Sequence, residues 1–216
     1  MIVAFDKRVQ VLTEATSDRV ALRAAITRAR TGGGTSLYGA LDAVINQAFR
    51  RLGGRKAIVL FTDGVDTASR GATYESTIRA AEESDAVIYP VQYNTYGDFA
   101  DNPSRQTYNV DNMAGSAHVT KNGELASEAY KRAALYLRLL AEKTGGHFQY
   151  TDSTKNLGRS FARVADELRQ QYTLGYYPKN RAGVGAERQI DVRVGVTGTS
   201  VRARKSYVYQ PPGPTP

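Results

Sequence analysis

Two short segments of this sequence carry oxygen-bearing side chains that could hold a hard metal ion. In residues 33–41 (GGTSLYGAL), Thr35 stands where a strongly periodic apolar segment begins. In residues 61–66 (FTDGVD), Asp63 directly follows a run of apolar residues. A hydroxyl and a carboxylate that face each other form a site that suits Mg²⁺ or Mn²⁺ rather than zinc. Thr35 and Asp63 are therefore the candidate metal ligands.

Each of these residues also has a local explanation. Thr35 is of a type that caps the N-terminus of a helix, and Asp63 followed by Gly64 is typical of a turn. Asp66 could support the site from behind Asp63, although a solvated turn residue is the simpler interpretation. The order and context of the two segments together favour the metal site.

The apolar pattern predicts that both candidate ligands lie at one edge of a parallel sheet. Apolar residues recur every three or four positions between 37 and 52, which indicates a helix that ends at Gly53. The continuous apolar run at 57–61 predicts a strand buried on both faces. Further strands are expected near 86–91 and 147–150, with helices near 74–84, near 130–143 and from Ser153 or Thr154 onwards. This alternation predicts an α/β fold with a doubly wound, mostly parallel sheet, whose carboxyl edge carries the ligand site.

The two ends of the chain have different patterns. Residues 2–12 indicate a β-hairpin, and a helix is expected from Ser17 or Asp18 to about Arg30. We assign residues 1–171 to the α/β domain, with an insertion at about 94–128 that either lies beside the bound ligand or has no ligand role. The remaining segments are a small antiparallel β-appendage at 172–209, with strands near 172–177, 190–196 and 201–207, and a disordered tail at 210–216.

Composition excludes several classes of protein. Among 216 residues, 29 are Lys or Arg and 21 are Asp or Glu, so the formal net charge is +8. The basic residues are scattered, so we expect no nucleic-acid binding. No apolar run approaches the roughly 20 residues that a membrane-spanning helix needs, and no signal peptide is expected at the N-terminus. The absence of Cys excludes disulfides and thiolate metal sites.

The segments that carry Thr35 and Asp63 resemble those of a von Willebrand factor A domain. The resemblance rests on residues 33–41 and on residues 56–69 (KAIVLFTDGVDTAS). Residues 161–180 (FARVADELRQQYTLGYYPKN) and 201–209 (VRARKSYVY) are similar to a bacterial VWFA-related family. The resemblance implies a metal-ion-dependent adhesion site in which Thr35 and Asp63 help to hold Mg²⁺ or Mn²⁺, and an acidic side chain of a partner protein completes the coordination. It also suggests an exported protein, while the compartment stays open.

One part of the family pattern has no match in these residues. The family's D-x-S-x-S segment is absent, and its first strand and first helix are missing as well. We favour the interpretation that the sequence is a fragment. A strand donated by another chain through self-association or partner binding, and a rearranged sheet, are the alternatives. In each case the chain as given is expected to bind Mg²⁺ weakly, because only one hydroxyl and one carboxylate are supplied.

These observations favour a protein-binding module over an enzyme. A scaffold domain with a vestigial metal site is the first alternative. A hydrolase that activates water with a bound metal is the second, although no general base stands in an evident position.

Overall fold

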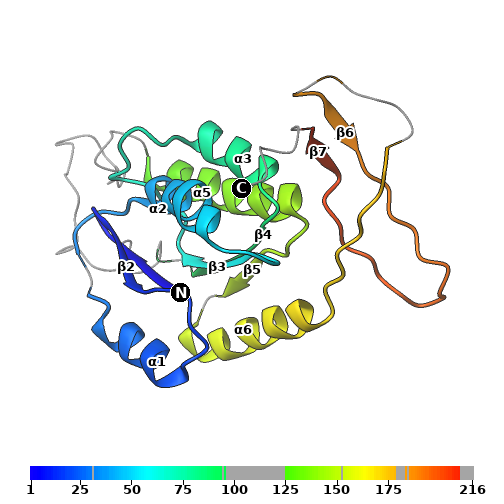
Figure 1. Ribbon diagram of the computed structural model, residues 1–216. Coiled ribbons are helices and arrows are strands. Elements are labelled where there is room, and N and C mark those ends of the chain that lie inside the picture. The colour runs from blue at the N-terminus through cyan, green and yellow to red at the C-terminus, as the bar shows by residue number, and fades with distance from the viewer. Residues whose placement is uncertain are drawn as a thin grey trace. The chain divides into compact units, whose positions relative to one another are not determined.

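The computed structural model describes residues 1–30, 32–93, 95, 125–151, 153–178, 183 and 185–209 (Figure 1). The chain divides into two compact units: residues 1–53, 63–77 and 95–136 form the first, and residues 54–62, 78–94 and 137–216 form the second. Helices α3 (Tyr74–Glu83) and α5 (Ala126–Thr144) each begin in the first unit and end in the second. Most of the proposed insertion at 94–128 and the whole proposed tail at 210–216 lie outside the described residues.

The first unit begins with the expected hairpin. Strands β1 (Ile2–Phe5) and β2 (Val9–Thr13) pair antiparallel, with Phe5 opposite Val9. The turn is closed by Asp6, whose backbone N–H donates to Arg8 O (3.0 Å) and whose Oδ1 accepts from Arg8 N (2.7 Å). An Asp side chain that bonds the backbone two residues ahead stabilises a tight turn. The tip of the hairpin therefore presents Lys7 and Arg8, both exposed.

Helix α1 (Arg19–Arg28) follows the hairpin and packs against it. Asp18 Oδ1 accepts hydrogen bonds from Val20 N (2.8 Å) and Ala21 N (3.3 Å), which satisfies two of the free N–H groups of the first turn. The predicted cap at Asp18 is confirmed. The helix ends at Arg28, two residues earlier than the expected end at about Arg30.

The helix predicted over residues 37–52 forms in three continuous parts, α2 (Leu37–Ala43), η1 (Val44–Ala48) and η2 (Phe49–Arg51). Of the stripe that the spacing predicted, Leu37, Leu41, Ile45 and Phe49 are buried, whereas Val44, Ala48 and Leu52 are half-buried. The N-cap is Ser36, whose own side chain makes no capping hydrogen bond. The local explanation of Thr35 as the cap is therefore wrong, because the helix starts one residue later.

The second unit contains the parallel sheet. Strands β3 (Ala57–Thr62), β4 (Val87–Tyr93) and β5 (Gln149–Thr151) pair in the order β3-β4-β5. The C-terminal part of α5 lies on one face, where Thr144 Oγ1 accepts from Ile88 N (3.0 Å), and α6 (Thr154–Arg169) covers the other (Figure 1). Ser153 caps α6 by accepting from Lys155 N (3.2 Å). The predicted α/β class, with helices on both faces of a parallel sheet, is confirmed.

Strand β3 departs from one expectation. Val59 is 41% exposed and Phe61 45% exposed, so the prediction that this strand is buried on both faces is wrong. Burial alternates along the strand, with Leu60 and Thr62 buried, so within the described part of the chain β3 buries only one of its two faces. The strand that is buried throughout is β4, where Ile88 and Val91 are fully buried.

The C-terminal region of the second unit contains one short antiparallel pair, β6 (Glu187–Gln189) and β7 (Ser206–Val208). This pair confirms the small antiparallel appendage. The strands expected near 172–177 and 190–196 do not form. Alternating apolar residues need a partner strand to become a ladder, and among the described residues these two segments have none; Tyr177 is fully exposed. Within the part of the chain that the structure describes, no helix is both long and apolar enough to cross a membrane.

Candidate functional site

The two segments that the sequence singled out lie side by side in the first unit. Thr35 O accepts hydrogen bonds from Thr67 N (2.9 Å) and Ala68 N (3.0 Å). In return, Thr35 N donates to Thr67 Oγ1 (2.9 Å). These bonds hold the loop at 63–70 against the entrance to α2. We call residues 34–39 and 63–70 together the rim.

Asp66 is the residue that ties the rim together most strongly. Its Oδ2 accepts from Tyr38 N (3.0 Å) and from the Ser69 hydroxyl, and its Oδ1 accepts from Ser69 N (3.0 Å). The Ser69 oxygen also accepts from Gly39 N (2.9 Å). Asp66 is therefore a structural anchor for the first turn of α2, and its interpretation as a solvated turn residue is wrong. Three residues that sequence reasoning overlooked, Ser36, Thr67 and Ser69, complete this network.

Three tyrosines of the first unit pack beneath this turn. The Tyr136 ring lies 5.0 Å from the Tyr38 ring and 4.8 Å from the Tyr74 ring, measured between centroids. The Tyr136 hydroxyl lies 2.7 Å from Thr77 Oγ1. Burial, and after it the negative charge of Asp66, raises the pKa of Tyr38 to about 12. The phenol therefore stays neutral at physiological pH, and the cluster acts as apolar support for the rim.

Asp63 has a different set of partners. Its Oδ1 accepts from Val65 N (3.0 Å) and its Oδ2 from the Thr95 hydroxyl (3.0 Å), which also lies 2.6 Å from the Tyr130 hydroxyl. Burial raises the pKa of Asp63, and the hydrogen bonds from Val65, Thr95 and Tyr130 oppose this shift in part. The carboxylate thus already serves as an acceptor for protein groups. Nothing in the sequence pattern pointed to Thr95 or Tyr130.

These residues fit only a weakly held metal ion. Thr35 is half-buried and Asp63 offers one carboxylate. Among the described residues, no group of three or more His, Cys, Asp or Glu side chains could hold a metal. Mg²⁺ requires six oxygen ligands in a near-octahedral array. Two protein ligands, one of them already hydrogen-bonded, would leave most of that array to water.

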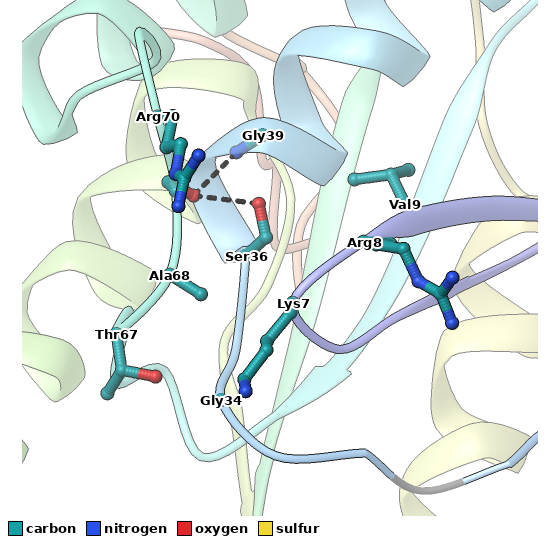
Figure 2. A pocket seen from close by; sticks show the side chains of 10 residues that line it. Lys7, Arg8, Val9, Gly34, Ser36, Gly39, Thr67, Ala68 and Arg70 are labelled. Atoms are coloured by element: carbon teal, nitrogen blue, oxygen red, sulfur yellow. Dashed lines mark hydrogen bonds between the residues drawn. The ribbon is translucent and has the colours of Figure 1, made fainter.

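A pocket of about 750 Å³ opens beside the rim (Figure 2). Its lining is mainly polar and basic, and consists of Lys7, Arg8, Val9, Gly34, Ser36, Gly39, Thr67, Ala68, Ser69 and Arg70. Figure 2 shows the Lys7 side chain running from the hairpin tip toward Gly34. Neither Thr35 nor Asp63 is part of this lining. This pocket at the rim therefore carries cationic rather than acidic side chains.

Comparison with known proteins identifies the pattern of the N-terminal third. Residues 1–65 match the family model of the von Willebrand factor type A domain, and this stretch includes both Thr35 and Asp63. The match confirms the resemblance that the rim segments indicated. No curated protein matches the chain.

Two solved structures show a partial likeness. The conserved hypothetical protein BatB from Bacteroides thetaiotaomicron is 14% identical, with 78% of each chain covered and a TM-score of 0.45. An uncharacterized membrane spanning protein from Vibrio fischeri is 21% identical, with 77% of this chain and 73% of that chain covered and a TM-score of 0.30. At these scores, neither structure bears on the function.

Proposed function

We propose a protein-binding role for this chain, whose residues 1–65 match the model of the von Willebrand factor type A domain. Domains of this family generally serve as protein-interaction modules. One observation supports the rim as the binding site. Hydrogen bonds between Thr35 and residues 67 and 68 join the two segments that resemble the family into one rim, and a pocket opens beside it. The partner docks on this rim and presents an acidic side chain to it. The proposal assigns the chain no catalytic reaction.

The finer part of the proposal concerns the metal ion. Thr35 and Asp63 are the residues that would hold Mg²⁺ or Mn²⁺, and the bound ion would supply a positive charge for the partner's carboxylate. Binding is weak for two reasons. Among the described residues the expected ligands are only Thr35 and Asp63, and the Asp63 carboxylate already accepts hydrogen bonds from Val65 and Thr95.

A second candidate function is a scaffold domain whose metal site is vestigial. The hydrogen bonds that Asp63 accepts from Val65 and Thr95 favour it, because they give the carboxylate a structural task without an ion. The two candidates differ in one observable, which is whether partner binding depends on a divalent cation.

The test places a photo-crosslinking amino acid at Ala68, which lines the pocket, and at Ala24, an exposed residue of α1 that does not. The protein-binding proposal expects a crosslinked protein from position 68 that is absent from position 24. Capture that increases with millimolar Mg²⁺ and falls with EDTA supports the metal-assisted form, whereas capture unaffected by EDTA supports a vestigial metal site. Identical crosslinks from both positions, or none from position 68, would refute the proposal.

Isothermal titration with Mg²⁺ accompanies this experiment. The dissociation constant is expected to lie at or above about 1 mM, with no detectable binding by Asp63→Asn, since that variant removes the only carboxylate of the pair. Micromolar binding would contradict the two-ligand description.

A further inference from the structure

We propose that the pocket beside the rim binds a carboxylate of the partner protein directly, through Lys7, Arg8 and Arg70, without a metal ion. The inference rests on the proposed function, since it names the group that receives the partner's acidic side chain. It also explains how the rim could attract an acidic partner although it holds a metal ion only weakly. With a weakly held ion, the attraction for an acidic partner has to come from another source of positive charge.

The three basic residues line one pocket from two separate segments. Lys7 and Arg8 form the tip of the β1–β2 turn, and Arg70 ends the loop that begins at Asp63. The backbone of Ser36 connects these segments, because its N–H donates to Asp6 O (2.6 Å) while its hydroxyl lies 3.1 Å from Ser69 Oγ. The cations are therefore positioned by a hydrogen-bonded frame.

Two glycines provide the space over which Lys7 extends. Gly34 has a φ of +89°, a conformation that side chains rarely adopt, and a Cβ there would lie 3.2 Å from Lys7 Cγ. A Cβ at Gly33 would lie 3.9 Å from Lys7 Nζ, so the ammonium group is close to the glycine backbone. The glycine-rich segment thus allows a long cationic side chain to lie flat along the pocket wall, as Figure 2 shows.

The basic side chains of the pocket are not paired with acidic side chains in the described part of the chain. Among the described residues, no carboxylate forms an ion pair with Lys7, Arg8 or Arg70. Asp6 and Asp66, the two aspartates nearest to them in sequence, direct their oxygens at neutral donors instead, since Asp6 accepts from Arg8 N and Asp66 accepts from Tyr38 and Ser69. Basic residues that line one recess create a positive potential there, which attracts an anion.

The pocket also offers a neutral donor. Thr67 Oγ1 accepts from Thr35 N, so its own proton remains to be donated, and within the described part of the chain no acceptor takes it. A hydroxyl donor next to cationic side chains suits a carboxylate, which accepts hydrogen bonds at both oxygens.

The lining favours a protein carboxylate over a nucleic acid. Proteins that bind single-stranded nucleic acid combine basic grooves with aromatic side chains on which bases stack. None of the described residues that line this pocket is aromatic. Besides the three basic residues, its walls are mostly hydroxyl and glycine residues, and its volume of about 750 Å³ exceeds that of an acidic side chain.

The test uses a fluorescein-labelled hexaglutamate peptide as the probe, with the full chain in low-salt buffer that contains EDTA. Fluorescence anisotropy is expected to show binding that weakens at least about fivefold in the double variant Lys7→Ala, Arg70→Ala, because exposed charge contacts contribute modestly one by one and add up around a pocket. Arg23→Ala is the matched control: Arg23 is an exposed arginine of α1 outside the pocket, and its removal should change affinity less than about twofold. Hexaglutamine should not bind.

Several results would overturn the inference. An equal loss in the Arg23→Ala control would show general charge attraction, and tighter binding of a twelve-residue oligothymidine than of hexaglutamate would show a nucleic-acid site. If hexaglutamate bound only when EDTA was replaced by Mg²⁺, and the double variant bound equally well under that condition, the ion would carry the contact, so the pocket inference would fail and the metal-assisted proposed function would stand. If hexaglutamate bound through the pocket but position 68 captured no protein, the pocket's affinity for carboxylates would be supported and the proposed protein-binding function would fail.

Discussion

Replacing Asp66 by Ala should disrupt the rim and lower the stability of the protein. In the native structure the Asp66 carboxylate accepts three hydrogen bonds, from Tyr38 N, from Ser69 N and from the Ser69 hydroxyl. The first of these joins the loop at 63–70 to the first turn of α2. The substitution removes the acceptor and leaves all three donors in place, two of them backbone N–H groups in partly buried surroundings.

The expected cost follows from these three bonds. A hydrogen bond to a charged acceptor contributes about 1.5–3 kcal/mol, and a partly buried donor left without a partner costs about 1–3 kcal/mol. The groups of Ser69 can turn to water, so the contributions are far from additive. We expect the free energy of unfolding to fall by about 2–4 kcal/mol. Asp66→Asn keeps one acceptor oxygen and should lose about half as much.

Urea unfolding followed by far-UV circular dichroism measures this change. Asp42→Ala is the matched control, because Asp42 also contacts the α2 region but accepts a single bond, from Asn46 Nδ2 (2.8 Å), and should cost about 0.5 kcal/mol. Hexaglutamate binding should weaken in Asp66→Ala, even though a negative charge has been removed near the cations, because the pocket loses its frame. A stability loss no larger than that of Asp42→Ala, combined with tighter peptide binding, would refute the anchoring role of Asp66.

Two further predictions concern stability. A Cβ at Gly146 would lie 1.9 Å from Ile88 O, so Gly146→Ala should lower the free energy of unfolding by about 2–4 kcal/mol. A Cβ at Gly158 on α6 would meet open space, so Gly158→Ala should raise the free energy of unfolding by about 0.5–1 kcal/mol. Thermal melts compare the two variants, and equal melting temperatures would contradict the contact at Gly146. Because burial raises the pKa of Asp63 above its ordinary value, folding is favoured at low pH and this contribution is lost as the pH rises through the folded-state pKa. The stability of Asp63→Asn relative to the natural chain should therefore increase from acid to neutral pH in urea titrations, and a constant difference would argue against a raised pKa.

Much of the fold follows from local patterns. The spacing of Leu37, Leu41 and Ile45 predicts the α2 region because one face of a helix must be apolar to be buried, and Asp18 predicts the start of α1 because its side chain can reach two free N–H groups. The strands near 172–177 and 190–196 were predicted on the same kind of pattern and do not form. Alternation describes which face a strand would bury, but a strand exists only where a neighbour accepts its hydrogen bonds.

For the candidate site, residue type and order along the chain were enough to select the segments around Thr35 and Asp63 and to indicate their family. The roles of the individual side chains depended on contacts between residues far apart in sequence. The bond from Tyr38 N made Asp66 an anchor, and the hydroxyl of Thr95 occupied an oxygen of Asp63. Likewise, Lys7 and Arg70 share a pocket only because the hairpin tip folds beside the rim. The sequence shows which residues are charged, but not which of them lie together in space. The grouping of charged side chains around one pocket, and the burial that changes a pKa, depend on the folded chain alone.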